Sequence, residues 1–263
     1  MTAHPLPGQP PAPRTWRSRR AWIVFLVSIT AALALDLISK QTAFATIAPD
    51  PVIVERERVL DAFARDRALA RVAEDLASLE HSAPAGPTAD ATIERRIDEL
   101  RLDLARLQSQ PGWSDLIPQH QPVVVIPQVL ELTLVLNPGA VFGIGAGARW
   151  FFVGFTLVAV AFVTWLFASW TRPRDWFAHA CAGMLIGGGI GNLYDRVVYA
   201  CVRDFLHPLP HATMPFSGGR PLWPYVSNIA DAILIVAILG LLVYSWRKPE
   251  TEEPQTPEAN ADA

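Results

Sequence analysis

A polar stretch decides the fold of this chain, and it begins with Gly187-Gly188-Gly189-Ile190-Gly191-Asn192-Leu193-Tyr194-Asp195-Arg196. It continues through Val202-Arg203-Asp204-Phe205 and ends at Asn228-Ile229-Ala230-Asp231, with a strongly apolar run on each side. An ionisable group inside a membrane segment costs about 2.5 kcal/mol or more, so a retained charge indicates a functional site. Two carboxylates held together can perform acid–base hydrolysis. We therefore interpret Asp204 and Asp231 as a candidate catalytic pair.

The composition indicates a membrane protein. Of the 263 residues, 51% are hydrophobic and only 18% are charged, whereas ordinary soluble domains have roughly 25% charged residues. The net charge of −3, without a basic patch that contains aromatic residues, gives no reason to expect a nucleic-acid partner. The sequence has no P-loop and no dinucleotide-binding fingerprint. Cys181 and Cys201 are predicted to stay unpaired, because a helical path would separate them by roughly 30 Å.

Four apolar runs predict four membrane-spanning helices, at residues 21–48, 150–170, 176–198 and 225–246. Tryptophans flank these runs, as expected at the two membrane interfaces. Basic residues precede the first run, lie in the loop between the second and third, and follow the last. The positive-inside rule places all three positions in the cytoplasm, so both termini are expected there.

The ends of the chain and the last external loop complete this topology. Residues 1–20 are expected to form a disordered cytoplasmic tail. Residues 248–263 are expected to form a second cytoplasmic tail, and residues 199–224 a catalytic loop within the region 150–247. A cleavable signal peptide is the alternative for the first run, but Asp36 and Lys40 interrupt it where a signal peptide is neutral.

The first external region is expected to hold an inserted helical hairpin and a small β-region. Residues 49–120 carry mixed acidic and arginine side chains with apolar residues at helical spacing, and residues 82–87 break the pattern. This pattern predicts two amphipathic helices folded together, either a solvated accessory element or a partner-binding module. Residues 121–149 begin with β-branched residues that predict strands and then contain Asn137-Pro138-Gly139-Ala140-Val141-Phe142-Gly143.

The expected fold class is thus mainly α and integral to the membrane, and the polar groups of its spans converge at one depth. At 1.5 Å per residue, Asp36 lies about 22 Å up the first helix and Asn192 about 24 Å up the third, with Arg196 one turn above. Asp231 lies near the outer start of the fourth helix. Lys40 shares a helix face with Asp36 and can pair with it. These positions predict a polar cavity open to the external leaflet.

Two carboxylates in such a cavity have a clear chemical use. One stays ionised and removes a proton from a water molecule, while the other stays protonated and donates to the scissile carbonyl. Like charges a few Å apart release their protons in two coupled steps. Metal and serine mechanisms are disfavoured, because the sequence has neither an HExxH nor a G-x-S-x-G motif. No cofactor and no metal are expected.

These residues carry a resemblance to a known family over about residues 21–48 and 121–247. The sequence resembles lipoprotein signal peptidase (signal peptidase II), a four-span aspartic protease of bacterial cytoplasmic membranes. The resemblance rests on the string at 187–196, Asp204-Phe205, Asn228-x-x-Asp231, Asp36 with Lys40, and Asn137-x-Gly139-Ala140-x-Phe142.

The resemblance implies a substrate, a site and a location. The implied substrate is a lipoprotein precursor whose cysteine already bears diacylglycerol, and cleavage just before that cysteine releases the signal peptide. Asp204 and Asp231 are implied as the catalytic dyad. Substrate-binding or supporting roles are implied for Asn137, Gly139, Asn192, Arg196, Asn228, Asp36 and Lys40. The implied protein is a monomeric, multi-pass protein of the inner membrane, in contact with membrane lipid, with its active site near the periplasmic face.

Structural roles are expected for a further group of residues. Gly188 and Gly191 allow helices to pack closely, and Phe142 belongs to the loop motif of the family. Asp195 is expected to pair with an arginine, and Arg203 is expected to be an exposed loop charge.

Two other function classes stay open. An ion-coupled transporter would use Asp36, Asp204 and Asp231 as a proton relay, and it predicts internal repeats and broken helices near the midplane. No repeat is visible in the sequence. A non-catalytic membrane scaffold would display the hairpin, and it predicts that Asp→Asn changes leave function intact. The chain also departs from the family pattern by the insertion at 52–110 and by a long, proline-rich loop at 206–224.

Overall fold

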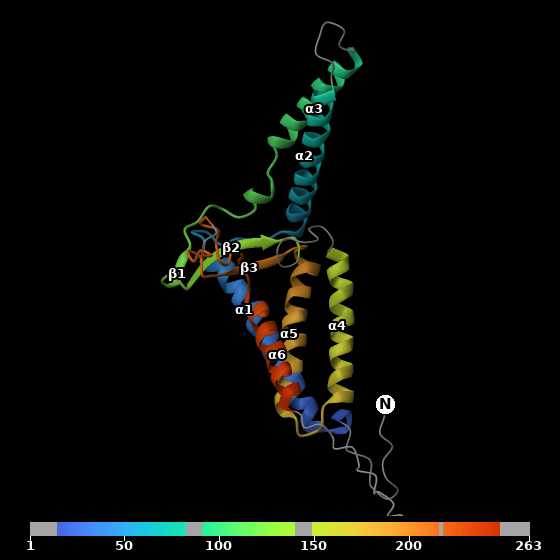
Figure 1. Ribbon diagram of the computed structural model, residues 1–263, viewed down its shortest axis with the longest axis vertical. Helices are drawn as coiled ribbons and strands as arrows, with labels where there is room; N and C mark the ends of the chain where they lie inside the picture. Colours follow the sequence, from blue (N-terminus) through green and yellow to red (C-terminus); the bar gives the residue numbers. More distant parts are fainter. Residues whose placement is uncertain (1–14, 83–90, 140–148, 216–217, 248–263) are drawn as a thin grey trace, which may run out of the picture.

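The computed structural model describes residues 15–82, 91–139, 149–215 and 218–247 of the chain. It is mainly helical and has one small sheet at one end of a helical bundle (Figure 1). Most of the predicted N-terminal tail, the C-terminal tail, the predicted break after residue 82 and the motif residue Phe142 lie outside the described residues.

Four long helices form the bundle: α1 (Arg19–Thr46), α4 (Arg149–Trp170), α5 (Trp176–Val198) and α6 (Ile229–Arg247). Within the described residues, α1, α4 and α6 are long and apolar enough to cross a membrane. Large apolar side chains cover their outer surfaces, and Val158 of α4 is 70% exposed. A helix that is apolar on its outer face as well as its inner face is typical of a membrane span.

Helix α5 lies at the centre of the bundle and contacts α1, α4 and α6 (Figure 1). Small residues make this close approach possible. A Cβ atom at Gly183 would lie 2.5 Å from the backbone oxygen of Phe25, and one at Gly187 would lie 2.6 Å from the backbone oxygen of Ile29, both in α1. Gly188 faces α6 instead, where a Cβ atom would lie 3.1 Å from the Ala230 oxygen. Packing through small residues is a common way to associate helices in membranes.

The sheet contains three antiparallel strands in the order β1 (Val123–Ile126), β2 (Leu130–Asn137) and β3 (Val202–Pro208). Strands β1 and β2 lie where the β-branched residues predict them. Strand β3 lies in a region expected to be a loop, and that expectation is wrong for residues 202–208. Pairing with β2 makes this segment a strand, because strand formation depends on the neighbours more than on the local sequence.

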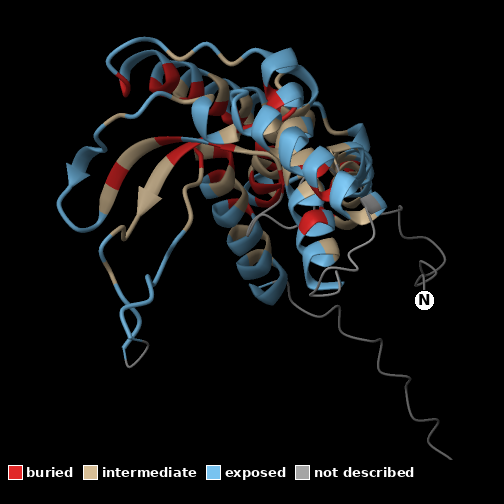
Figure 2. Cartoon of the chain, turned by 90° about the horizontal axis from the view of Figure 1, so that it is seen from above, coloured by how far each residue is buried: buried red, intermediate tan, exposed pale blue. Residues whose placement is uncertain are grey.

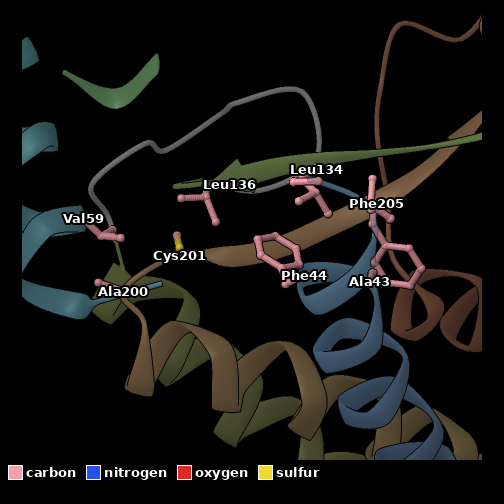
Figure 3. Close-up of a cluster of buried hydrophobic side chains, with 10 residues drawn as sticks. Ala43, Phe44, Val59, Leu134, Leu136, Ala200, Cys201 and Phe205 are labelled. Atoms are coloured by element: carbon pink, nitrogen blue, oxygen red, sulfur yellow. The ribbon is translucent and has the colours of Figure 1, made fainter. Parts of the chain in front are cut away.

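A hydrophobic cluster joins the sheet to the bundle (Figure 3). Phe44 near the end of α1 packs in one cluster with Leu136 of β2 and Phe205 of β3. Buried residues gather where the helices and the sheet meet, whereas the outer faces of the helices are exposed (Figure 2). The sheet is therefore fixed at one end of the bundle, next to the C-terminal ends of α1 and α5.

Helices α2 (Arg56–Ser82) and α3 (Ala91–Gln108) pack against each other and extend away from the bundle (Figure 1). Their contact consists of apolar residues at helical spacing, with Leu76, Ile97 and Leu100 buried at its centre. The base of α2 is not separate from the rest of the molecule, because Val59 is 2% exposed and belongs to the cluster of Figure 3. Two short 3-10 turns, η1 (Thr15–Arg17) and η2 (Trp113–Asp115), complete the described elements.

Candidate active site

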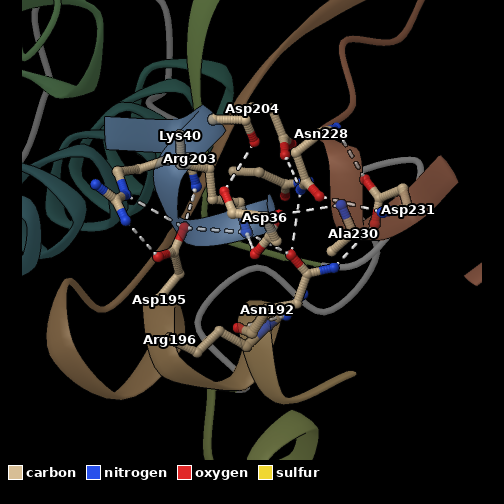
Figure 4. Close-up of polar contacts among 12 residues, drawn as sticks. Asp36, Lys40, Asn192, Asp195, Arg196, Arg203, Asp204, Asn228, Ala230 and Asp231 are labelled. Atoms are coloured by element: carbon tan, nitrogen blue, oxygen red, sulfur yellow. Dashed lines mark hydrogen bonds and ion pairs between the residues drawn. The ribbon is translucent and has the colours of Figure 1, made fainter. Parts of the chain in front are cut away.

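The polar residues of the predicted spans meet where α1, α5 and the start of α6 reach the sheet (Figure 4). Three helices and two strands contribute side chains to this cluster. Its members are Asp36, Lys40, Asn137, Asn192, Asp195, Arg196, Arg203, Asp204, Asn228 and Asp231.

Lys40 is the cation at the centre of the cluster, and its side chain is fully buried. Its Nζ lies 2.8 Å from Asp36 Oδ2 and 3.4 Å from Asp195 Oδ2. It also donates a hydrogen bond of 2.9 Å to Asn192 Oδ1. A buried ammonium group needs such partners, because each charge removed from water carries a desolvation cost of several kcal/mol. Lys40 therefore joins α1 to two positions of α5.

Asp36 connects α1 to α6. Its Oδ2 atom accepts from Lys40, and its Oδ1 atom accepts a 3.0 Å hydrogen bond from the backbone N–H of Ala230. Ala230 lies in the first turn of α6, where backbone N–H groups lack partners within the helix and the helix dipole favours negative charge. The Asp36 carboxylate therefore fixes the N-terminal end of α6, which also carries Asp231.

Gly191 is the position on α5 that permits this arrangement, because a Cβ atom there would overlap the Asp36 carboxylate. We expect Gly191→Ala to lower stability by about 1–3 kcal/mol, the usual cost of overpacking a core, and to reduce activity by displacing Asp36. The thermal unfolding midpoint in detergent measures the effect. Gly189→Ala on the same helix is the matched control, because its added methyl meets only a Thr156 carbon at 3.8 Å. Equal midpoints for the two variants would contradict the prediction.

Arg203 is the partner of Asp195. Arg203 Nη2 lies 2.9 Å from Asp195 Oδ1, and its backbone N–H donates to Asp195 Oδ2 at 3.0 Å. Its guanidinium also lies 4.3 Å from the centre of the Tyr199 ring. The expectation of an exposed loop charge is wrong, because Arg203 is only 4% exposed. Strand β3 causes the difference, since it turns Arg203 toward the end of α5.

Asn228 holds both carboxylates of the candidate dyad. It precedes α6, and its Oδ1 atom accepts from the Asp231 backbone N–H while Asp231 Oδ2 accepts from the Asn228 N–H, each at 3.2 Å. This reciprocal pair has the geometry of a capping box. The Asn228 side-chain amide also donates to Asp204 Oδ1 at 2.6 Å. One asparagine thus orients Asp204 and Asp231 at the same time.

Two further amides complete the positioning of the carboxylates. Asn192 Nδ2 donates to Asp231 Oδ1 at 2.9 Å, and Asn137 Nδ2 donates to Asp204 Oδ2 at 3.1 Å. Arg196 holds the Asn137 loop by donating to the Gly139 carbonyl at 3.0 Å. The Arg196 guanidinium also lies 5.2 Å from the centre of the Phe152 ring on α4.

The two carboxylates lie in different environments. Asp204 is 1% exposed, whereas Asp231 is half-buried. Burial, and after it the nearby Asp231 carboxylate, raise the pKa of Asp204 to about 7, against the lowering effect of the Asn228 and Asn137 hydrogen bonds. A carboxyl group with such a pKa still carries its proton in much of the population just below pH 7 and can act as a general acid. In the described residues, no group of three or more His, Cys, Asp or Glu side chains has the arrangement of a metal site.

Comparison with known proteins places the chain in a family. Residues 107–247 match the family model described as signal peptidase (SPase) II. The chain belongs to the signal peptidase II family. It is 34% identical to a lipoprotein signal peptidase of Desulfitobacterium hafniense over 137 residues, which are 52% of this chain and 81% of that protein. It is 39% identical to a lipoprotein signal peptidase of Cupriavidus taiwanensis over 122 residues, or 45% of this chain and 63% of that protein.

A solved bacterial membrane enzyme also aligns with the structure, at 24% identity and a TM-score of 0.41 over 52% of this chain and 77% of that one. The part of the chain that matches the signal peptidase II model contains Asn137, Asn192, Asp204 and Asp231. It begins after α1, and the Asp36–Lys40 pair contacts the matched region through Lys40 with Asn192 and through Asp36 with Ala230.

The sequence indicates most members of this polar cluster, but it does not indicate Arg203 or Gln41. Gln41 lies next to Lys40, and its Oε1 atom accepts from Arg203 Nη1 at 3.4 Å. The expected arginine partner of Asp195 could not be identified from spacing alone. The prediction of a strand at this position would have identified Arg203, because side chains alternate along a strand and Arg203 and Asp204 then face opposite sides.

Proposed function

We propose that this chain is an aspartic endopeptidase that removes signal peptides from lipoprotein precursors carrying a diacylglyceryl cysteine, with cleavage just before that cysteine. The observation that supports it best is the pair Asp204 and Asp231, oriented by Asn228 beside a buried network of fixed charges. Membership of the signal peptidase II family and the lipoprotein signal peptidases among the relatives support the same substrate.

The different environments of the two carboxylates assign their roles in the proposed reaction. Asp231 is the more exposed and accepts the proton of the attacking water, whose oxygen forms a bond to the scissile carbonyl carbon. Asp204 donates its proton to the carbonyl oxygen, which gives a neutral tetrahedral diol. When the C–N bond breaks, the nitrogen of the lipidated cysteine takes the proton held by Asp231, and the diol returns a proton to Asp204.

We further propose that α1, α4, α5 and α6 all span the inner membrane, with both termini in the cytoplasm. Helix α5 has 23 residues and runs beside the three strongly apolar helices (Figure 1). The connection between α4 and α5 contains Arg172 and Arg174, which the positive-inside rule places in the cytoplasm. The dyad lies at the opposite end of the helices, near the external face, where the diacylglyceryl group of a precursor can stay in the outer leaflet. The proposed enzyme is a monomer.

Helices α2 and α3 constitute an external insertion in this proposal. The family match begins at residue 107, and it leaves α2 and all but the last two residues of α3 outside it. Strands β1 and β2 belong to the external β-region of this proposal, and β3 lies between α5 and α6 in the chain.

A precursor-processing assay tests the proposed function. The full chain in detergent is incubated in separate reactions with a precursor that carries diacylglyceryl cysteine and with the same precursor without the lipid. The masses of the products are measured by mass spectrometry. We expect cleavage of the lipidated precursor immediately before the cysteine. Cleavage elsewhere, or no cleavage, would contradict the proposal. A transporter or a scaffold would leave both precursors intact.

The pH dependence of cleavage follows from the pKa of Asp204. Because its pKa is raised to about 7, Asp204 keeps its proton below that pH and loses it above, so kcat/KM should fall as the pH rises through about 7. Asn137→Ala removes a hydrogen bond that lowers this pKa. The alkaline limb should therefore move upward by about 0.5–1 pH unit, since a hydrogen bond contributes about 1 kcal/mol.

The control for this pH profile is Gln110→Ala, which removes an exposed amide in a loop away from the dyad. Its profile should match that of the wild type. An Asn137→Ala profile that moves downward, or does not move, would show that Asp204 is not the titrating acid.

A further inference from the structure

A groove runs along the outer edge of β2, on the external side of the bundle. Its volume is about 720 Å³, within the usual range of ligand-binding sites. The edge of β2 from Leu134 to Leu136 forms one wall, and Trp113, Ser114 and residues 117–121 form the opposite wall with Pro49. Both walls belong to this chain, so the groove is a built feature of the sheet region.

The β2 edge in this groove has no neighbouring strand among the described residues. Strand β1 pairs with β2 only at Leu130, Glu131 and Leu132. From Leu134 onward, β2 pairs on its other side alone, with β3. An unpaired strand edge presents a row of N–H and C=O groups that can pair with another polypeptide.

The hydrogen bonds of β3 show which peptide groups of β2 point into the groove. Arg203 donates its backbone N–H to Asp195, and Phe205 donates its backbone N–H to Ser227, so both point away from β2. In an antiparallel pair, the residue opposite such a position also directs its N–H and C=O away from the partner strand. Leu136 is opposite Arg203, so its peptide groups point toward the groove.

His120 occupies the position where an additional strand would begin. Its Nε2 atom accepts a 2.9 Å hydrogen bond from the Leu134 backbone N–H, and its Nδ1 atom lies 2.9 Å from the Pro118 carbonyl oxygen. Nε2 is therefore the acceptor and Nδ1 the donor in this arrangement. The imidazole satisfies the first free N–H of the edge, and the groove continues past it toward Leu136.

The groove lies next to the candidate active site along β2. Asn137 follows Leu136 directly, and its side chain holds Asp204 at 3.1 Å. Val135, which lines the groove and is 36% exposed, is the cross-strand partner of Asp204. A strand added to β2 would thus lie beside the strand that pairs with β3, which carries Asp204.

We propose that this groove binds the residues that follow the lipidated cysteine of the precursor, as an extended strand added to the free edge of β2; this inference rests on the peptidase function proposed above. The signal peptide lies on the membrane side of the scissile bond, so the external groove is left for the mature side. Backbone hydrogen bonds provide affinity in strand addition with little demand on side-chain sequence. Such binding suits an enzyme whose substrates differ after the cysteine.

Backbone methylation of the substrate tests the hydrogen bonds. Lipidated precursor peptides carry one N-methyl group at each of the second to sixth positions after the scissile bond, with side chains unchanged. We expect kcat/KM to fall about fivefold at alternate positions, because one hydrogen bond of about 1 kcal/mol corresponds to that factor. Equal kcat/KM for all methylated peptides overturns the groove assignment and leaves the peptidase function intact. Failure to cleave the unmethylated precursor overturns both.

A variant that fills the groove tests its location. Ser114→Trp places a large side chain in the groove from an exposed position of the outer wall and should raise KM at least about fivefold with kcat unchanged, the signature of lost uniform binding. Leu102→Trp, at a position of α3 that is 71% exposed and outside the groove, is the matched control and should leave KM unchanged. An unchanged KM for Ser114→Trp overturns the assignment. The assignment is also overturned if a second copy of the chain, and not the precursor, occupies the groove.

Discussion

Asp204→Asn and Asp231→Asn are each expected to slow precursor cleavage at least about 100-fold, because a general acid or base contributes about 10²–10⁴-fold to the rate. Asp204→Asn removes the proton donated to the scissile carbonyl, and Asp231→Asn removes the base that takes a proton from water. Both changes nearly conserve the shape of the side chain. Single-turnover cleavage of a diacylglyceryl precursor, followed by gel shift, measures the rate without interference from product release.

Two controls separate chemistry from folding in this experiment. Asp50→Asn changes an exposed carboxylate beyond the end of α1 and should keep the wild-type rate. The unfolding midpoints of the dyad variants should stay close to that of the wild type, since an asparagine can still accept from Asn228 at either position. If either dyad variant processes the precursor at the wild-type rate, the carboxylate concerned has no catalytic role.

The helices of the bundle could be predicted from the sequence because their apolar runs are long and contain few charged residues. The predicted run at 176–198 coincides with α5, and the others differ from the observed helices by a few residues. The largest difference is at α6, which begins at Ile229 instead of residue 225. Ser227 forms a β-bridge with Leu206 of β3, and Asn228 caps the helix. The helix therefore begins only after these two residues.

Strand β3 could not be predicted, because neither of its two faces consists of apolar residues alone. Two adjacent charged residues of β3 serve opposite faces of the sheet: Arg203 turns to Asp195, and Asp204 turns to Asn137 and Asn228. The period-2 alternation of a strand produces this division. In the sequence these two residues are adjacent charges that follow a helix, a pattern that is typical of a loop. Only the pairing with β2 shows that the segment is a strand.

The position of the candidate site could be predicted from the sequence, because its polar residues lie at one depth along the helices. The hydrogen bonds between these residues could not be predicted. The spacing of Asp36 and Lys40 predicts their pairing, and the structure gives a distance of 2.8 Å. Spacing does not predict the contact between Lys40 and Asn192, which are 152 positions apart. It also does not predict the hydrogen bond that Asp36 accepts from the Ala230 N–H. These contacts depend on the close approach of α5 to α1 at Gly187 and Gly191.

Lys40→Met should cause the largest loss of stability of any single change considered for this protein. The variant leaves Asp36 with neither a cation nor water around it, since both side chains have no exposed surface. Removing one partner of a buried ion pair costs about 3–5 kcal/mol, because the remaining charge is buried without compensation. Denaturant unfolding in detergent should show a loss of this size, and cleavage should fall as well because Asp36 fixes the end of α6 that carries Asp231.

A double variant and a surface control distinguish charge burial from lost packing. Adding Asp36→Asn to Lys40→Met restores a neutral pair and should recover part of the stability, since Asp195 keeps Arg203 as its cation. Arg101→Met breaks the exposed pair with Glu80 and should cost less than about 1 kcal/mol. If Lys40→Met is no more damaging than Arg101→Met, the buried charges do not hold α1, α5 and α6 together. If the double variant is less stable than Lys40→Met alone, the hydrogen bond from Ala230 to Asp36 outweighs the cost of the unpaired charge.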